Sequence, residues 1–334
     1  MSKEAQFYKK LNNKQVKCYL CPHQCTISSG KRGLCRVREN KDGTLYSLNY
    51  IRFVATHIDP IEKKPLFHFM PGSQAYSIAA IGCNFHCLHC QNWSISQVKD
   101  DHILGEKISP EQIIENTINA QCQSIAYTYT EPTIYYETAY DISRLAHQKG
   151  LKNIFITNGY IGTEALDRIA PFLDAVNIDL KAMNEAFYQK VCGARLQPVL
   201  NNIEHYYKLG IWLEITTLII PDYNDNLSEL KKIARFIAGI SKDIPWHITA
   251  FYPSYQLSGV EQTPIEKLDK AFQIGREAGL KYVYQGNIGR REETYCPNCG
   301  QLLIERPSFY KTENKIQKGQ CPYCGEKIKG IFVG

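Results

Sequence analysis

Clustered cysteines are the feature that most constrains how this chain of 334 residues can fold. Eleven of its thirteen cysteines fall in three groups, at residues 18–35, 83–90 and 296–324. The N-terminus, Met-Ser-Lys-Glu-Ala-Gln, does not resemble a signal peptide, so disulfides formed on export are not expected. Dense thiols in a chain without an export signal indicate metal ligation. The sequence therefore predicts three thiolate metal sites.

Composition and charge narrow the class of protein. Hydrophobic residues make up 44% of the chain, which is enough for a large core, and no stretch reaches the apolar length of a membrane span. The formal net charge of +6 is modest, and no long basic run indicates nucleic-acid binding. We expect a cytoplasmic protein with no membrane partner. The two ungrouped cysteines, Cys122 and Cys192, are predicted to be core residues.

Residues 74–290 alternate short apolar segments with longer segments of helical periodicity. Helices are expected between the strands, and two of them are predicted to begin at the capping boxes that start with Ser109 and Thr263. Such alternation predicts a parallel sheet with helices outside. Six or seven strands suit a partial (β/α) barrel, and the absence of a G-x-G-x-x-G run disfavours a doubly wound open sheet. Strands are expected at residues 75–81, 124–130, 153–157, 175–180, 211–219, 247–252 and 281–285.

Three domains follow from these patterns. Residues 1–73 form a cysteine-rich N-terminal segment, and residues 74–290 form an α/β partial barrel of about six parallel strands. Residues 291–334 form a zinc-ribbon-like module. In a barrel of this type, catalytic groups lie at the carboxyl ends of the strands, so the site is expected at that edge.

The central cysteines follow the first predicted strand as Cys83-x3-Cys87-x2-Cys90. Iron–sulfur clusters are bound by cysteine thiolates, and three ligands leave one iron of a four-iron cluster without a protein thiolate. An open position on a metal is where a substrate or cofactor binds. Structural zinc is the alternative, with His86 or His89 as the fourth ligand.

This run resembles the cysteine motif of radical S-adenosylmethionine (SAM) enzymes. The resemblance implies a [4Fe-4S] cluster on Cys83, Cys87 and Cys90, with SAM bound at the open iron. It implies an oxidoreductase-type enzyme that cleaves SAM reductively and uses the 5′-deoxyadenosyl radical to abstract hydrogen from a substrate. It also implies an electron donor such as flavodoxin or ferredoxin.

Polar residues after the predicted strands are candidates for a SAM pocket. Related enzymes carry a Gly-Gly-Glu motif that holds the SAM amino group, and Glu131 stands at that position although the glycines are replaced. The run from Asp179 to Asn184 and the stretch around His247 resemble segments of pyruvate formate-lyase activating enzyme that lie at SAM. The candidates are Glu131, Asn158, Asp179, Lys181 and His247.

Each candidate also has a purely structural explanation. Glu131 suits the start of a helix, and Asn158-Gly159 suits a turn. An ion pair would explain Asp179 with Lys181, and a satisfied structural histidine would explain His247. Glu214, a polar residue in an apolar strand, is equally well explained by a contact inside the barrel.

Motifs outside the barrel narrow the resemblance. The segments Cys18–Cys35, Asp59–Leu66 and Tyr129–Thr133 together resemble the AmmeMemoRadiSam system radical SAM enzymes, a family associated with Memo-like and AMMECR-like proteins. The likeness to activating enzymes implies a glycyl radical enzyme as an alternative partner. A metal-stabilised binding protein without turnover is the alternative of a different class.

The N-terminal group has the spacing Cys18-x2-Cys21-x3-Cys25-x9-Cys35. Four thiols suit either structural zinc or an auxiliary iron–sulfur cluster, and spacing alone does not choose between them.

The C-terminal group consists of two Cys-Pro-x-Cys-Gly knuckles. Their glycines permit tight turns, and paired knuckles of this kind are typical of a zinc ribbon, although tetrahedral sulfur sites also take iron. A module with so few apolar residues needs its metal to fold. The predicted zinc ligands are Cys296, Cys299, Cys321 and Cys324.

Overall fold

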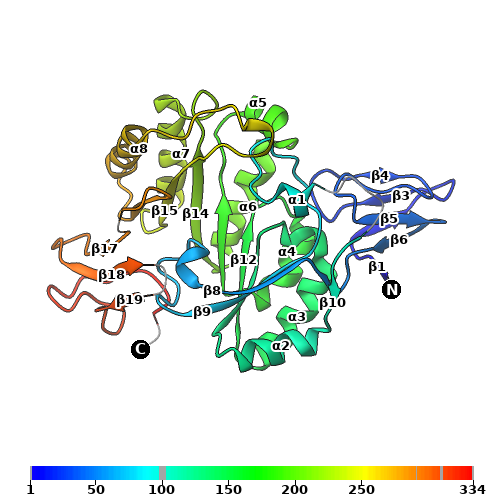
Figure 1. Cartoon of the computed structure of the whole chain (residues 1–334), viewed down its shortest axis with the longest axis horizontal. Helices are drawn as coiled ribbons and strands as arrows, with labels where there is room; N and C mark the ends of the chain where they lie inside the picture. Colours follow the sequence, from blue (N-terminus) through cyan, green and yellow to red (C-terminus); the bar gives the residue numbers. More distant parts are fainter. Residues whose placement is uncertain (1, 98–102, 291, 309–310, 333–334) are drawn as a thin grey trace.

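The computed structural model describes residues 2–97, 103–290, 292–308 and 311–332. Within these residues the centre is an eight-stranded sheet in the order β16-β15-β14-β13-β12-β11-β9-β8 (Figure 1). All neighbouring strands from β9 to β16 are parallel, whereas the edge strand β8 (Ala55–Pro60) is antiparallel to β9. The parallel strands are β9 (Gln74–Ala79), β11 (Ser124–Tyr127), β12 (Lys152–Thr157), β13 (Ala175–Asp179), β14 (Trp212–Ile219), β15 (Trp246–Ala250) and β16 (Val283–Gly286).

Helices connect these strands. Ser109 caps α2 as predicted, because its hydroxyl accepts a hydrogen bond from the Gln112 amide at 3.2 Å. The predicted cap at Thr263 is wrong: its hydroxyl accepts from the Phe251 amide and donates to the Ile219 carbonyl, which joins the ends of β15 and β14. No helix of the described residues has the length and apolar character needed to cross a membrane. The helices are α1 (Trp93–Ser96), α2 (Pro110–Asn119), α3 (Tyr136–Gln148), α4 (Thr163–Ile169), α5 (Glu185–Phe187), α6 (Leu196–Lys208), α7 (Leu227–Ile240) and α8 (Ile265–Glu277), with short turns η1 (Ile61–Lys63), η2 (Pro132–Tyr135), η3 (Ala170–Phe172), η4 (Tyr188–Cys192) and η5 (Tyr255–Leu257).

The two faces of the sheet bury different partners. Side chains alternate between faces along each strand, so one set packs under the helices and the other points inward. Residues 61–70, which follow β8, close part of the inner face. The boundary predicted at residue 73 therefore lies between two paired strands, β8 and β9. The inner cluster consists of Ile61, Leu66, Phe69, Met70, Ala75, Ala126, Ile154 and Ala175.

A small β module flanks the sheet on each side (Figure 1). The N-terminal module has two three-stranded antiparallel sheets, and the C-terminal module has one. Strands β7 and β10 pair with each other apart from these sheets. The remaining strands are β1 (Lys3–Glu4), β2 (Tyr8–Lys10), β3 (Val16–Cys18), β4 (Thr26–Ile27), β5 (Arg38–Lys41), β6 (Thr44–Ser47), β7 (Arg52–Phe53), β10 (Glu106–Lys107), β17 (Thr294–Tyr295), β18 (Leu302–Ser308) and β19 (Lys311–Asn314).

The predicted α/β fold with a mostly parallel central sheet is confirmed. The seven parallel strands of the described residues agree with the expected six or seven. The sequence did not predict that β8 would extend the sheet, because residues 55–60 were assigned to the N-terminal segment.

Candidate functional site

The central cysteine loop leaves β9 at the carboxyl edge of the sheet. The Cys83 sulfur accepts a hydrogen bond from the Phe85 amide at 3.3 Å, and the Cys90 sulfur lies 3.1 Å from the Ser96 hydroxyl. Burial, the nearby Glu131 carboxylate and the Cys87 thiol hold the pKa of the Cys83 thiol well above its usual value. A cationic iron centre would reverse that preference, because bound metal ions dominate local charge and deprotonate coordinating thiols.

The turn η4 fixes the conformation of this loop. The amides of His86 and Leu88 donate to the carbonyls of Cys192 and Val191 at 2.8 and 2.9 Å. The thiols of Cys87 and Cys192 are also hydrogen-bonded, and this bond lowers the pKa of Cys87. Cys192 is fully buried, which confirms the core prediction, but its position beside a predicted ligand was not expected from the sequence.

Glu131 is buried directly beneath the loop that follows β12. One carboxylate oxygen accepts from the Thr133 amide, the Thr133 hydroxyl and the Thr157 hydroxyl at 2.6–3.0 Å. The other oxygen accepts from the Asn158 amide at 2.8 Å. Burial raises the pKa of this carboxyl. Glu131 thus connects two strand ends, and a direct bond from it to a ligand ammonium stays a prediction.

Asn158 lies between this carboxylate and the cysteine loop. The side-chain nitrogen Nδ2 of Asn158 donates to the Asn84 side-chain oxygen at 2.8 Å and is 3.9 Å from the Cys83 sulfur. Asn158 is therefore held against the cysteine loop at both its backbone and its side chain.

Asp179 and Lys181 also lie at the carboxyl edge. The Lys181 ammonium is 2.9 Å from the Asp179 carboxylate, as in the ion pair that the sequence allowed. Burial alone would lower the pKa of Lys181, but Asp179 and the thiols of Cys87 and Cys192 raise it well above its usual value. The structure therefore brings a stable positive charge close to the cysteine loop.

His247 lies in a different environment from the other candidates. Its Nε2 atom is 2.7 Å from the Glu214 carboxylate, and its ring stacks on Tyr284. Glu214 also accepts from the amides of Phe67 and His68 at 2.9 and 2.8 Å. These are contacts inside the barrel, and the role of His247 at a SAM ribose stays a prediction.

Sequence reasoning missed a charged cluster on the segment that follows β8. Lys64 is buried, and its ammonium is 2.7 Å from the Asp59 carboxylate and 4.5 Å from the centre of the Tyr129 ring. The Tyr129 hydroxyl donates to Asp59, and the Tyr129 carbonyl accepts from Asn92, two residues after Cys90. The motif Asp59–Leu66 contributed to the resemblance, but nothing in it indicated this contact.

The C-terminal thiols form a compact group. The sulfur atoms of Cys296, Cys299, Cys321 and Cys324 all lie within 4.8 Å of one another. Two of these separations are 3.6 and 3.7 Å. A tetrahedron with metal–sulfur bonds of about 2.3 Å has edges of about 3.8 Å, so the group can hold one metal ion.

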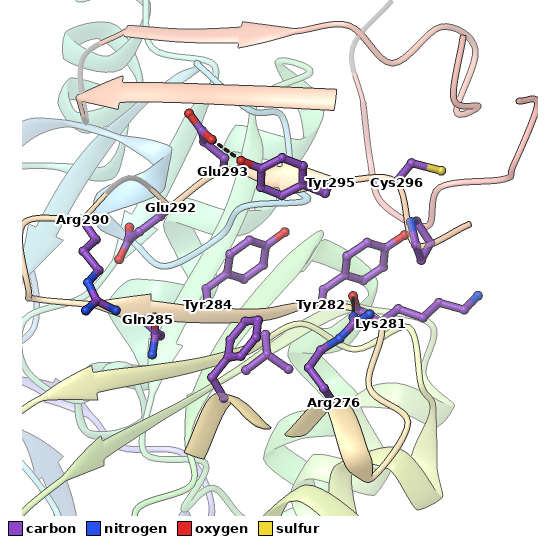
Figure 2. A pocket seen from close by; sticks show the side chains of 13 residues that line it. Arg276, Lys281, Tyr282, Tyr284, Gln285, Arg290, Glu292, Glu293, Tyr295 and Cys296 are labelled. Carbon is purple, nitrogen blue, oxygen red and sulfur yellow. Dashed lines mark hydrogen bonds between the residues drawn. The ribbon is translucent and has the colours of Figure 1, made fainter. Parts of the chain in front are cut away.

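A hollow separates the last barrel strand from this module. Figure 2 shows the rings of Tyr282 and Tyr284 between β16 and the strand that contains Tyr295. Glu292 lines the same hollow, where burial raises the pKa of its carboxyl to about 7. The module is therefore packed on the barrel edge through aromatic and titratable groups.

Comparison with known sequences gives a consistent assignment. The Radical SAM superfamily matches residues 78–237. An uncharacterized protein of Methanocaldococcus jannaschii is 50% identical over 331 residues, which are 98% of this chain and 98% of that protein. The benzylsuccinate synthase activating enzyme of Thauera aromatica is 22% identical and covers 57% of this chain and 60% of its own. The pyruvate formate-lyase-activating enzyme of Clostridium pasteurianum is 20% identical, and the match covers 57% of this chain and 84% of that enzyme.

Solved structures show the same fold. A radical SAM methyltransferase from Sphaerobacter thermophilus has a TM-score of 0.53 at 16% identity, over 70% of this chain and 71% of its own. SuiB of Streptococcus suis bound to SAM has a TM-score of 0.52 at 10% identity, and the match covers 69% of this chain and 53% of SuiB. The family implies SAM and a [4Fe-4S] cluster as cofactors. With the cysteine loop at the carboxyl edge of its sheet, this chain belongs to the radical SAM superfamily and is an enzyme.

Proposed function

We propose that this enzyme cleaves SAM reductively at a [4Fe-4S] cluster bound by Cys83, Cys87 and Cys90. The 5′-deoxyadenosyl radical then abstracts hydrogen from a substrate. The observation that carries the proposal is the three-thiol loop at the carboxyl edge, with its backbone fixed by η4. The cluster, when bound, supplies an electron and an open coordination position.

The neighbouring residues have distinct roles in this proposal. Glu131 fixes the backbone of Asn158, so that the Asn158 side chain stays beside Cys83. The Lys181–Asp179 pair presents one donor and one acceptor group at the same edge, which suits the carboxylate and amino groups of SAM. His247 lies on β15. The resemblance to pyruvate formate-lyase activating enzyme predicts that this histidine is close to the SAM ribose.

The first test measures 5′-deoxyadenosine after anaerobic reconstitution. We expect Cys83→Ala, Cys87→Ala and Cys90→Ala to reduce its formation by at least about a thousandfold, because each change removes a cluster ligand. Cys122→Ala is the matched control, since this cysteine is outside all three groups. Production at the wild-type level in all three ligand variants would show that the cluster assignment is wrong.

A second candidate activity is the activation of a glycyl radical enzyme. Two of the relatives described above are named as activating enzymes, and each of these two matches covers 57% of this chain. Mixing the reconstituted protein with a candidate glycyl radical enzyme, SAM and reduced flavodoxin or ferredoxin tests this activity. A glycyl doublet in the EPR spectrum supports it, whereas SAM turnover without the doublet favours another substrate. Memo-like and AMMECR-like proteins stay the partners that the resemblance predicts.

For the C-terminal group we propose zinc. The sulfur separations suit a single tetrahedral ion, and Cys299 and Cys324 lie exposed on a module without its own large core. Elemental analysis of protein purified without oxygen distinguishes zinc from the alternative, a single iron.

A further inference from the structure

We propose that Cys18, Cys21, Cys25 and Cys35 bind an auxiliary iron–sulfur cluster and not zinc. We infer also that this cluster is in direct contact with the catalytic cysteine loop. The inference extends the proposed function, because it gives that loop a second redox centre as its neighbour.

The spacing of the thiols distinguishes the two metal types. Among the described residues, the C-terminal thiols meet the spacing that a single ion requires, and the N-terminal thiols do not. The N-terminal thiols nevertheless line one common cavity, so they belong to one site. In a four-iron cluster each thiolate binds a different iron, which spreads the sulfurs more widely than around one ion.

The surroundings of the thiols also suit a cluster. The cavity that all four thiols line is largely enclosed. The rest of its lining is mainly apolar, and the buried Arg38 guanidinium donates to the Cys18 sulfur at 3.6 Å. An apolar wall restricts solvent, and a donor to sulfur favours the negative charge of a thiolate-bound cluster.

The cavity touches the catalytic loop at two points. Asn84 lines the cavity, its carbonyl is 2.8 Å from the His23 ring, and its side-chain oxygen is 4.0 Å from the Cys83 sulfur. At the second point Gly82 has a φ of +105°, and a Cβ added there would lie 3.1 Å from the Cys35 carbonyl. The backbone of one cysteine group thus packs directly on that of the other. One side chain, Asn84, separates the cavity from Cys83. An electron from an external protein donor would therefore have a short path from the auxiliary cluster to the cluster on Cys83, Cys87 and Cys90.

The test counts iron and acid-labile sulfide in full-length protein purified and reconstituted without oxygen. The triple variant Cys83→Ala/Cys87→Ala/Cys90→Ala keeps the N-terminal thiols, and we expect it to retain about half of the wild-type iron and sulfide. The double variant Cys21→Ser/Cys25→Ser is expected to lose the iron and sulfide of the N-terminal site, which is the half that the triple variant retains. Its remaining EPR signal should still change when SAM is added, whereas the signal of the triple variant should not. Cys122→Ser is the control and should keep the full content.

Two results would overturn the inference. The first is a triple variant that binds no iron and holds two zinc ions per chain. The second is wild-type iron content in the double variant, which would remove the N-terminal thiols from iron binding. Failure of the proposed function gives a different pattern, in which iron depends on the N-terminal thiols alone and no signal responds to SAM.

Discussion

The two terminal modules each contain four grouped cysteines, but they arrange these thiols differently in space. In the C-terminal module each knuckle places two thiols on one tight turn, and two such turns bring the four sulfurs together. In the N-terminal module Cys35 reaches the site from a separate segment, ten residues after Cys25, and the thiols surround a cavity. The compact group lies beside the barrel edge, and the open group lies against the catalytic loop. Arrangement, not cysteine count, is therefore the basis on which we propose a structural ion in one module and a redox centre in the other.

Both modules are joined to the barrel by a buried arginine and a glutamate. Arg38 of the N-terminal module pairs with Glu137 on α3. Arg306 of the C-terminal module is 3.7 Å from Glu62 and donates to the Phe67 carbonyl at 2.7 Å. The two attachments are alike in using a buried arginine and a glutamate, but Arg38 also contacts the thiol of Cys18.

The largest effect is expected from removing the C-terminal metal. Cys296→Ser should abolish zinc binding and unfold the described part of the C-terminal module, because metal binding in such modules supplies on the order of 10 kcal/mol of folding free energy. Zinc analysis together with limited proteolysis measures this. The barrel should stay resistant, since its sheet has a separate core. A protected C-terminal module without zinc would contradict the assignment of a metal-dependent fold.

The next effect concerns the N-terminal attachment. Arg38→Met leaves Glu137 buried without its partner, which we expect to cost about 3–5 kcal/mol in the free energy of unfolding. Urea unfolding measures the loss. Arg38→Met/Glu137→Leu should recover much of it, because both charges are then absent.

The matched change in the other module is Arg306→Met. It should also destabilise the protein, but it should leave iron content unchanged, whereas Arg38→Met should lower it because Arg38 contacts Cys18. Equal iron content in both variants would remove the functional difference between the two attachments.

Periodicity predicted most of the barrel, because parallel strands and their helices alternate in a regular sequence pattern. The strand β8 was missed because it precedes the alternating region and pairs antiparallel at the edge. The cap at Thr263 was misassigned because its hydroxyl is used by two strand ends that are distant in sequence. The contacts of Lys64 with Asp59 and of Cys192 with Cys87 were missed for the same reason, since these partners are brought close only by the fold.

Contact between the two cysteine groups at Gly82 gives a sharper test. Gly82→Ala forces a side chain into a left-handed conformation and places its Cβ 2.9 Å from Val37 and 3.1 Å from the Cys35 carbonyl. We expect a loss of about 2–4 kcal/mol and lower 5′-deoxyadenosine formation. Gly150→Ala has a similar backbone strain at φ +74° with no neighbour within 4 Å, and should cost only about 1 kcal/mol. Equal losses in activity would indicate that the contact has no role in the site.

The smallest expected effect is a pH dependence of stability at Glu292, which lines the hollow between β16 and the C-terminal module. Burial raises the pKa of Glu292 from 4.5 to about 7, so the folded protein binds this proton more tightly than the unfolded chain. The resulting stability is complete below pH 4.5 and is lost as the pH rises through about 7. Glu292→Gln should therefore match wild type near pH 5 and exceed it at pH 8 by on the order of 2 kcal/mol in urea unfolding. Glu277→Gln, an exposed change of the same charge on α8, should keep the wild-type profile. If Glu292→Gln also keeps that profile, burial of Glu292 in the hollow between β16 and the C-terminal module does not affect stability.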